Sequence, residues 1–156
     1  VGGCDDGVAP FTTNVTINPN PVLTITNAAT SICSGDAVDI TLNSPTLNHQ
    51  INLISVNYGA VTGGTASGPY TDGNKITEVL NNDTSGAINI TYEFNITTSD
   101  GCPLTPISQF TTVTVSPAPT FNVINNSPVI CSEELSDIDI TSTTTGAVIE
   151  LINVTA

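Results

Sequence analysis

Short runs of alternating apolar and polar residues occur along most of this chain and predict β-strands. The clearest run is INITYEFNI, residues 88–96, which places Ile, Tyr and Phe on one side and Asn, Thr and Glu on the other. A strand with one wholly apolar face belongs in the middle of a sheet, so we expect it to be central. Further strands are expected at 22–26, 38–42, 51–56, 75–80 and 110–115. No segment keeps a helical period.

The chain repeats itself at an offset of 98 residues. The matches are two pairs of cysteines and two pairs of strand-like segments: Cys4 with Cys102, Cys33 with Cys131, 14–21 with 112–119, and 51–56 with 149–154. A period this long exceeds that of solenoid units, which is about 20–50 residues. It has the size of one Ig-like domain, which is about 100 residues.

The offset divides the chain into three parts. We expect 1–18 to be the C-terminal strand of a preceding repeat, 19–117 a complete repeat, and 118–156 the N-terminal part of the following one. About seven short strands in one repeat predict an all-β fold, an Ig-like or PKD-like Greek-key β-sandwich in a tandem array. Alternatively, the two end fragments complement each other between copies in a polymer, but both lack a counterpart of residues 59–98.

Charge excludes several classes of partner. The chain has 14 acidic residues against one basic residue, Lys75, and a formal net charge of −13. Nucleic acid is excluded as a partner because phosphate neutralisation needs clustered Lys or Arg. Anionic membrane surfaces are disfavoured for the same reason. The apolar runs are too short to cross a bilayer, so no membrane insertion is expected.

Several short motifs resemble a known family of repeats. They are ICSG at 32–35, Leu80-Asn81, ITY at 90–92 leading into GCP at 101–103, and TVTVSPAPT at 112–120. In these motifs the chain resembles the PKD-like and Ig-like repeats of large cell-surface adhesins of the Bacteroidota, including gliding-motility adhesins and other type IX secretion cargo. The resemblance implies an extracellular location on the cell surface and a role as adhesin or spacer.

The four cysteines are disulfide candidates: Cys4, Cys33, Cys102 and Cys131. Without nearby pairs of His, they fit an oxidising compartment better than a zinc site. With an Ig-like strand order, Cys33 would lie in the turn that enters the second strand, ~25 Å or more from Cys102 in the last hairpin. A bond inside the repeat, bonds between neighbouring repeats, and free thiols all remain open.

Oxygen-bearing side chains near turns are candidate calcium ligands. Asp72, Asn74 and Asp83 lie in or beside expected loops, and calcium prefers such hard oxygen ligands. No EF-hand spacing is present. The alternative is a solvated acidic surface that keeps the protein soluble.

These observations predict a non-enzymatic structural spacer in a secreted cell-surface adhesin or extracellular fibre. Its expected partners are neighbouring repeats of the same polypeptide, with surface glycans or other copies of the fibre as further candidates. No cofactor is expected other than calcium. The alternatives are a calcium- or glycan-binding adhesion module and a subunit of a filament that exchanges strands.

Overall fold

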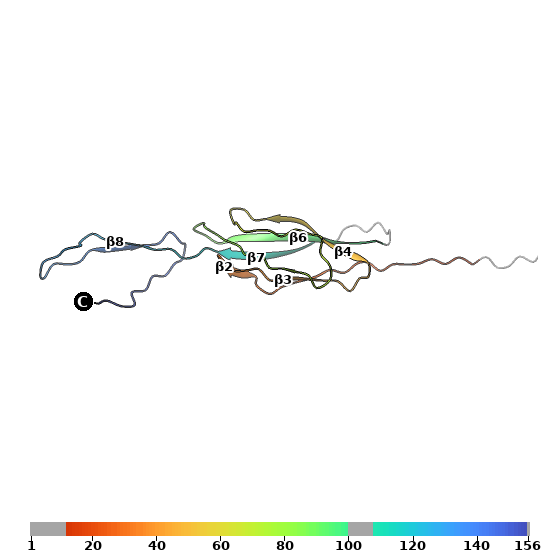
Figure 1. Ribbon diagram of the computed structural model, residues 1–156, viewed down its shortest axis with the longest axis horizontal. Helices are drawn as coiled ribbons and strands as arrows, with labels where there is room; N and C mark the ends of the chain where they lie inside the picture. The colour runs from red at the N-terminus through yellow and green to blue at the C-terminus, as the bar shows by residue number, and fades with distance from the viewer. Residues whose placement is uncertain (1–11, 100–107, 156) are drawn as a thin grey trace, which may run out of the picture.

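The computed structural model describes residues 12–99 and 108–155, and it contains strands and no helix within those ranges. Residues 22–99 and 108–116 form two sheets around one apolar core, which we call the two-sheet body. Residues 117–155, the tail, leave the end of this body that lies opposite the incoming residues 12–21 (Figure 1). The expected all-β class is therefore confirmed.

Seven strands build the two-sheet body. A three-stranded sheet has the order β1-β3-β5, from β1 (Thr24–Asn27), β3 (Ile40–Asn43) and β5 (Lys75–Ile76). A four-stranded sheet has the order β2-β7-β6-β4, from β2 (Ser31–Cys33), β7 (Gln109–Ser116), β6 (Ile88–Thr98) and β4 (His49–Asn57). Neighbours are antiparallel except β2 and β7, which are parallel. In the tail, β8 (Asn122–Asn125) pairs with β9 (Ile138–Thr141).

The central strand of the larger sheet is β6, as the alternating pattern predicts. It is hydrogen-bonded to β4 on one side and to β7 on the other. Ile90, Tyr92 and Phe94 on its inner face are 0% exposed. The rings of Tyr92 and Phe94 are nearly parallel, with an interplanar angle of 9°. Ile40 and Leu42 of β3 belong to the same core, so the two sheets bury their apolar faces against each other.

Two local expectations are wrong. The turn expected around Cys33 begins later, because Ser31–Cys33 forms β2 alongside Thr114 to Ser116 of β7. A strand of three residues is too short to show an alternating pattern in the sequence. The strand expected at 75–80 is paired regularly only at Lys75–Ile76, followed by an isolated bridge from Val79 to Ala37. Glu78 points into the body between the buried Ile76 and Leu80, so the burial alternates along 75–80 although a charged residue type stands at an inward position.

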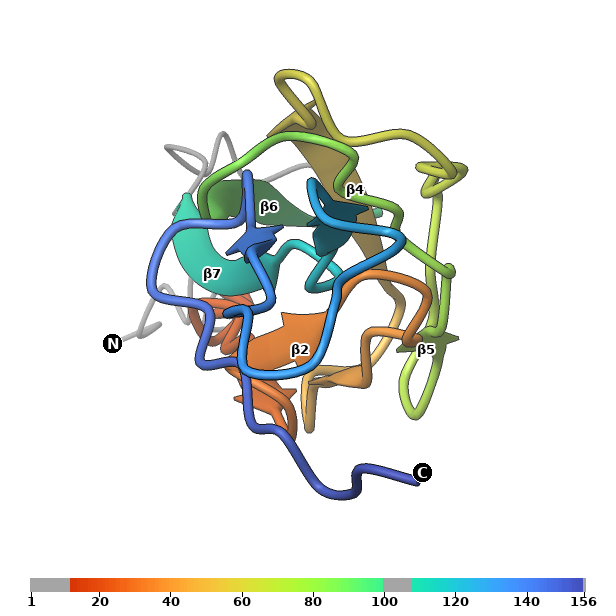
Figure 2. The same ribbon diagram turned by 90° about the vertical axis from the view of Figure 1, so that its left-hand side faces the viewer.

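The antiparallel pair β8–β9 repeats the antiparallel pair β1–β3 at the offset of 98 residues. We call each pair a hairpin, although β2 lies between β1 and β3 in the chain. Its register is the same, since Thr24 faces Asn43 and Asn122 faces Thr141. Side-chain bonds recur as well: the Asn27 side chain accepts from Ala29 N, and the Asn125 side chain accepts from Ser127 N. Figure 2 looks along the long axis and shows this second hairpin in front of the two-sheet body.

The turns around the two hairpins repeat in the same detail. Cys33 N donates to the Asp36 carboxylate at 3.1 Å, and Cys131 N donates to the Glu134 carboxylate at 2.8 Å. The residue before each carboxylate has a left-handed backbone, with φ of 92° at Gly35 and 72° at Glu133. The equivalence therefore extends to backbone conformations that most residues avoid.

Two segments of the tail match strands of the body without forming strands. Residues 149–154 match the middle of β4, and 129–131 match β2, yet neither is a strand. In the body, β4 is bonded to β6, and β2 is bonded to β7. The described tail has no counterpart of β6 or β7, so these segments lack the partners that hold their equivalents.

The packing of β6 gives a first testable expectation. Replacing Phe94 by Ala leaves a cavity between the sheets and should lower the free energy of unfolding by about 3–5 kcal/mol. Urea denaturation measures the change. Thr91→Ala, on the exposed face of the same strand, should change it by no more than about 0.5 kcal/mol. Equal losses in the two variants would contradict the assigned faces.

Candidate functional site

A buried carboxylate is the main polar cluster inside the two-sheet body. Glu78 is only 7% exposed. Its oxygens accept hydrogen bonds from the hydroxyls of Tyr58 and Tyr92, at 2.9 and 2.5 Å, and from the backbone N–H groups of Thr65 and Ala66, both at 2.6 Å. No described ion pair involves Glu78. Hydrogen-bond donors therefore solvate this buried charge in place of water.

Four segments bring these groups together. Tyr92 lies in β6, Tyr58 directly follows β4, and Glu78 follows β5. The loop with Thr65 and Ala66 approaches closely because it begins with two glycines. A Cβ on Gly64 would lie 2.3 Å from the Tyr58 ring, and one on Gly63 would lie 2.2 Å from the carbonyl oxygen of Val79. The cluster ties this loop to both sheets.

The tyrosines stay protonated well beyond neutral pH. Burial raises the pKa of Tyr92 above its ordinary value of 10, and its hydrogen bond to the Glu78 carboxylate raises it further. Tyr58 is shifted in the same direction by the same causes. Both hydroxyls are therefore donors that hold the carboxylate in place.

The candidate calcium ligands lie at the two ends of the body. Asp72 and Asn74 share a turn beside the end of β3, where Asp72 accepts from Ser44 N at 2.7 Å and Asn74 accepts from Thr71 N at 2.8 Å. Asp83 lies at the other end, next to Asn82, whose amide donates to the carbonyl of Val115 near the end of β7. The structure brings Asp72 and Asn74 together but not Asp83.

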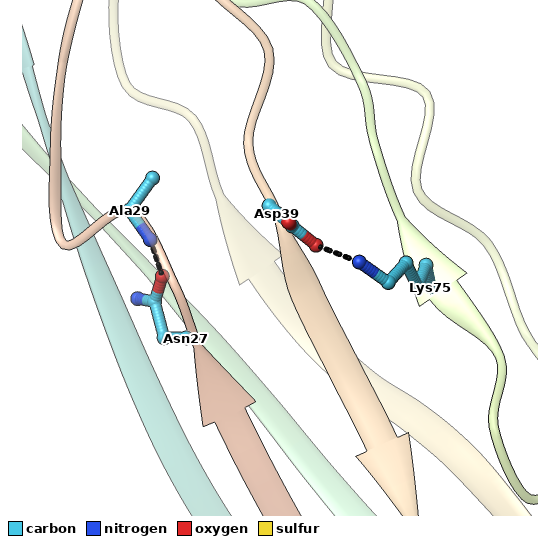
Figure 3. A network of polar contacts seen from close by, with 4 residues as sticks. All are labelled: Asn27, Ala29, Asp39 and Lys75. Atoms are coloured by element: carbon cyan, nitrogen blue, oxygen red, sulfur yellow. Dashed lines mark hydrogen bonds and ion pairs between the residues drawn. The ribbon is translucent and has the colours of Figure 1, made fainter.

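Among the described residues, no group of three or more His, Cys, Asp or Glu side chains could hold a metal ion. The surface ion pair is shown in Figure 3, where Lys75 Nζ lies 2.7 Å from the Asp39 carboxylate. Both side chains are about half exposed. Such a pair contributes about 0–1 kcal/mol to stability, so it joins β5 to the start of β3 only weakly.

The described cysteines are two exposed free thiols, Cys33 and Cys131. Cys33 ends β2 and Cys131 takes the equivalent position in the tail, each directly before a turn. Cys33 faces Ser116 at the end of β7, from which the tail departs. Cys4 and Cys102 lie outside the described residues. The disulfide pairing therefore stays a prediction.

The tail carries a large apolar surface, which we call the open face. It is formed by the side chains of Phe121, Val123, Ile138, Ile140, Ile149 and Leu151, around a hollow of about 640 Å³. Phe121 is 69% exposed, whereas its equivalent Leu23 is 4% exposed. Ile140 is 44% exposed and its equivalent Leu42 is 0% exposed. The open face thus corresponds to half of the core of the two-sheet body.

A polar contact joins the tail to the body. Thr145 N donates to the carbonyl of Ser85 at 2.9 Å, between the tail turn after β9 and the body loop before β6. The turn itself is held by Thr120 N, which donates to Thr144 Oγ1, just as Val22 N donates to Thr46 Oγ1 at the opposite end of the body.

Sequence reasoning missed both Glu78 and the open face. Glu78 stands in a run that reads as an ordinary strand, and nothing in one dimension shows that two distant tyrosines converge on it. The open face had a usable signal, because the offset aligns Phe121, Ile138 and Ile140 with apolar positions of the complete repeat.

No protein-family model, curated protein or solved structure matches the chain. Its own architecture defines the class: an all-β protein whose first hairpin, with its turns and caps, occurs a second time after the two-sheet body.

The buried cluster predicts how stability responds to pH. Since the folded tyrosines hold their protons more tightly than unfolded ones, the unfolded state releases protons first as the pH rises above about 10. The free energy of unfolding should be constant around neutral pH and fall above pH 10. Tyr92→Phe should lower it at neutral pH by about 1–3 kcal/mol and make the alkaline fall shallower.

Denaturant titrations from pH 7 to pH 11.5 measure both effects. A double-mutant cycle with Glu78→Gln is the control, because groups in contact show a coupling energy and independent groups do not. The contact between Tyr92 and Glu78 would be contradicted if the two variants lowered the free energy of unfolding additively. It would also be contradicted if Tyr92→Phe left the fall in stability above pH 10 unchanged.

Proposed function

We propose that this chain is part of a tandem array of Ig-like or PKD-like Greek-key β-sandwiches, in which residues 19–117 are one repeat and 118–156 begin the next. The observation that carries the proposal is the recurrence of the same hairpin, turns and caps at one offset. Support for the Ig-like type comes from the strand order, with one sheet β1-β3-β5 and a second sheet containing β4, β6 and β7.

The proposed work of each repeat is mechanical: it is a non-enzymatic spacer in a secreted cell-surface adhesin or extracellular fibre. The chain enters the two-sheet body at one end and leaves it at the other (Figure 1), so every copy adds its length to the array. Pro117 and Pro119 follow β7 and restrict the backbone between body and tail. The acidic surface keeps neighbouring fibres apart.

An extracellular location is supported by the four cysteines, which fit an oxidising compartment, and by the resemblance of the short motifs. The described part of the chain contains no helix long and apolar enough to cross a membrane. A calcium- or glycan-binding module is the second candidate for function. The observation that favours its calcium form is the pair Asp72 and Asn74, which share one turn.

The spacer proposal is tested by completing the second repeat. A copy of residues 59–117 added after Ala156 supplies every strand that the tail lacks. Pulled by its ends in a force microscope, the extended chain should unfold in two similar steps, each releasing roughly 300 Å of polypeptide. The original chain should show one such step. A single step in both chains would overturn the tandem-repeat proposal.

Calcium titration separates the two candidate functions. We expect excess calcium and excess chelator to give the same melting temperature, because Asp72 and Asn74 already accept backbone N–H groups and Asp83 lies at the other end of the body. Calorimetry and thermal unfolding measure this directly. A calcium-dependent rise in melting temperature that is lost in Asp72→Asn would favour the calcium-binding module instead.

A further inference from the structure

The first and last segments of the two-sheet body run side by side in the same direction. Val22 N donates to Thr46 Oγ1 at the end where the chain enters, and Cys33 faces Ser116 at the end where it leaves (Figure 1). Since β2 is parallel to β7, residues 22–34 run from the entry end to the exit end, as β7 does.

A row of hydrogen bonds joins these two segments, and we call this row the seam. Thr114 N donates to the carbonyl of Thr30 at 2.9 Å, and Ser34 N donates to the carbonyl of Ser116 at 2.8 Å. Between these two bonds, Ser31–Cys33 pairs with β7 as a parallel ladder. The seam therefore covers the whole exit end of β7.

The side chain of Asn27 extends the seam toward the entry end. Its amide nitrogen donates to the carbonyl of Thr112 at 3.0 Å and to Thr111 Oγ1 at 3.1 Å. Its amide oxygen accepts from Ala29 N at 3.1 Å, as Figure 3 shows. The oxygen thus fixes the side chain to its own turn, while the nitrogen bonds to β7 before the ladder of β2 begins.

A pull along the array would act on the two segments in opposite directions. Tension on residues 12–21 draws 22–34 toward the entry end, and tension on the chain after Ser116 draws β7 toward the exit end. The bonds of the seam lie across this sliding motion, so they are strained together and not one after another. Releasing β1 from β3 would lengthen the chain only as far as Asn27, because the seam still holds the residues that follow.

We propose that the seam is the part of each repeat that resists pulling, and that Asn27 strengthens it with its two side-chain bonds to β7. The proposal rests on the spacer function proposed above. A spacer under tension stays folded only while its two pulled segments stay joined, and the seam joins them directly. The pairing of β4 with β6 and the bonds of Glu78 lie outside this path, so they stabilise the fold without taking up the force directly.

Pulling the 156-residue chain by its two ends at constant force tests the role of Asn27. Asn27→Asp keeps the acceptor for Ala29 N and removes both donors to β7, so the body should unfold roughly three- to tenfold faster. Asn52→Asp is the matched control, because Asn52 is also half-buried and its amide donates to the Asn95 side chain at 3.0 Å, between β4 and β6. This control should unfold at the original rate. Equal rates in the two variants would overturn the proposal.

The direction of pulling separates a contact that resists force from one that only stabilises the fold. Handles attached at Ala37 and Ala118, both exposed and both at the exit end, would peel the seam from Cys33 and Ser116 and reach Asn27 last. The original chain should then unfold at a lower force, and Asn27→Asp should unfold at the original rate. An equal acceleration by Asn27→Asp in both directions would overturn the proposal, because a general loss of stability acts whatever the direction.

The extended chain, with its second repeat completed, distinguishes the two proposals. If it unfolds in a single step, the tandem-repeat proposal fails. If it unfolds in two similar steps and Asn27→Asp leaves the unfolding rate of the original chain under tension between its ends unchanged, only the proposal for the seam fails.

Discussion

The pairing of β6 with both of its neighbours is the constraint on which the rest of the structure depends. This strand bonds to β4 and β7 and presents Ile90, Tyr92, Phe94 and Ile96 to the core. The core side chains of the smaller sheet are buried because they face the sheet that β6 organises. Tyr92 also supplies a donor to Glu78, the buried acidic residue of the described ranges, so the same strand contributes both to the apolar packing and to the hydrogen bonds of this carboxylate.

The tail shows what happens without that strand. INLISV at 51–56 lies in a regular strand, whereas the similar IELINV at 149–154 does not. The hairpin β8–β9 forms nonetheless, because the backbone bonds, caps and turns within it are local to residues 120–144. Local chemistry is thus sufficient for this hairpin, and the flanking strands need partners distant in sequence. The apolar residues of the tail are therefore exposed where their equivalents in the two-sheet body are buried.

This division also explains what could be predicted from the sequence. The strands β6 and β7 were predictable because their inward residues alternate over many positions, and the repeated hairpin was predictable from the offset. The three residues of β2 gave no periodic signal, since their pairing with β7 is decided by how the chain bends after Asn27. The Glu78 cluster was not predictable, because its four donors come from segments that converge only in the fold. The expected calcium set failed to converge for the same reason, since Asp72 and Asp83 are near in sequence but lie at opposite ends of the body.

Amide hydrogen exchange tests the central claim, that residues 118–156 are an unfinished copy of the body, most directly. In the original chain, the amides of Ile138 and Ile140 should exchange faster than those of their equivalents Ile40 and Leu42, which face β5 and the turn before it. When a copy of residues 59–117 follows Ala156, the two sets should become equally protected. The account would be contradicted if the tail amides of the original chain were as protected as those of the body. It would also be contradicted if they stayed unprotected after the copy of residues 59–117 is added.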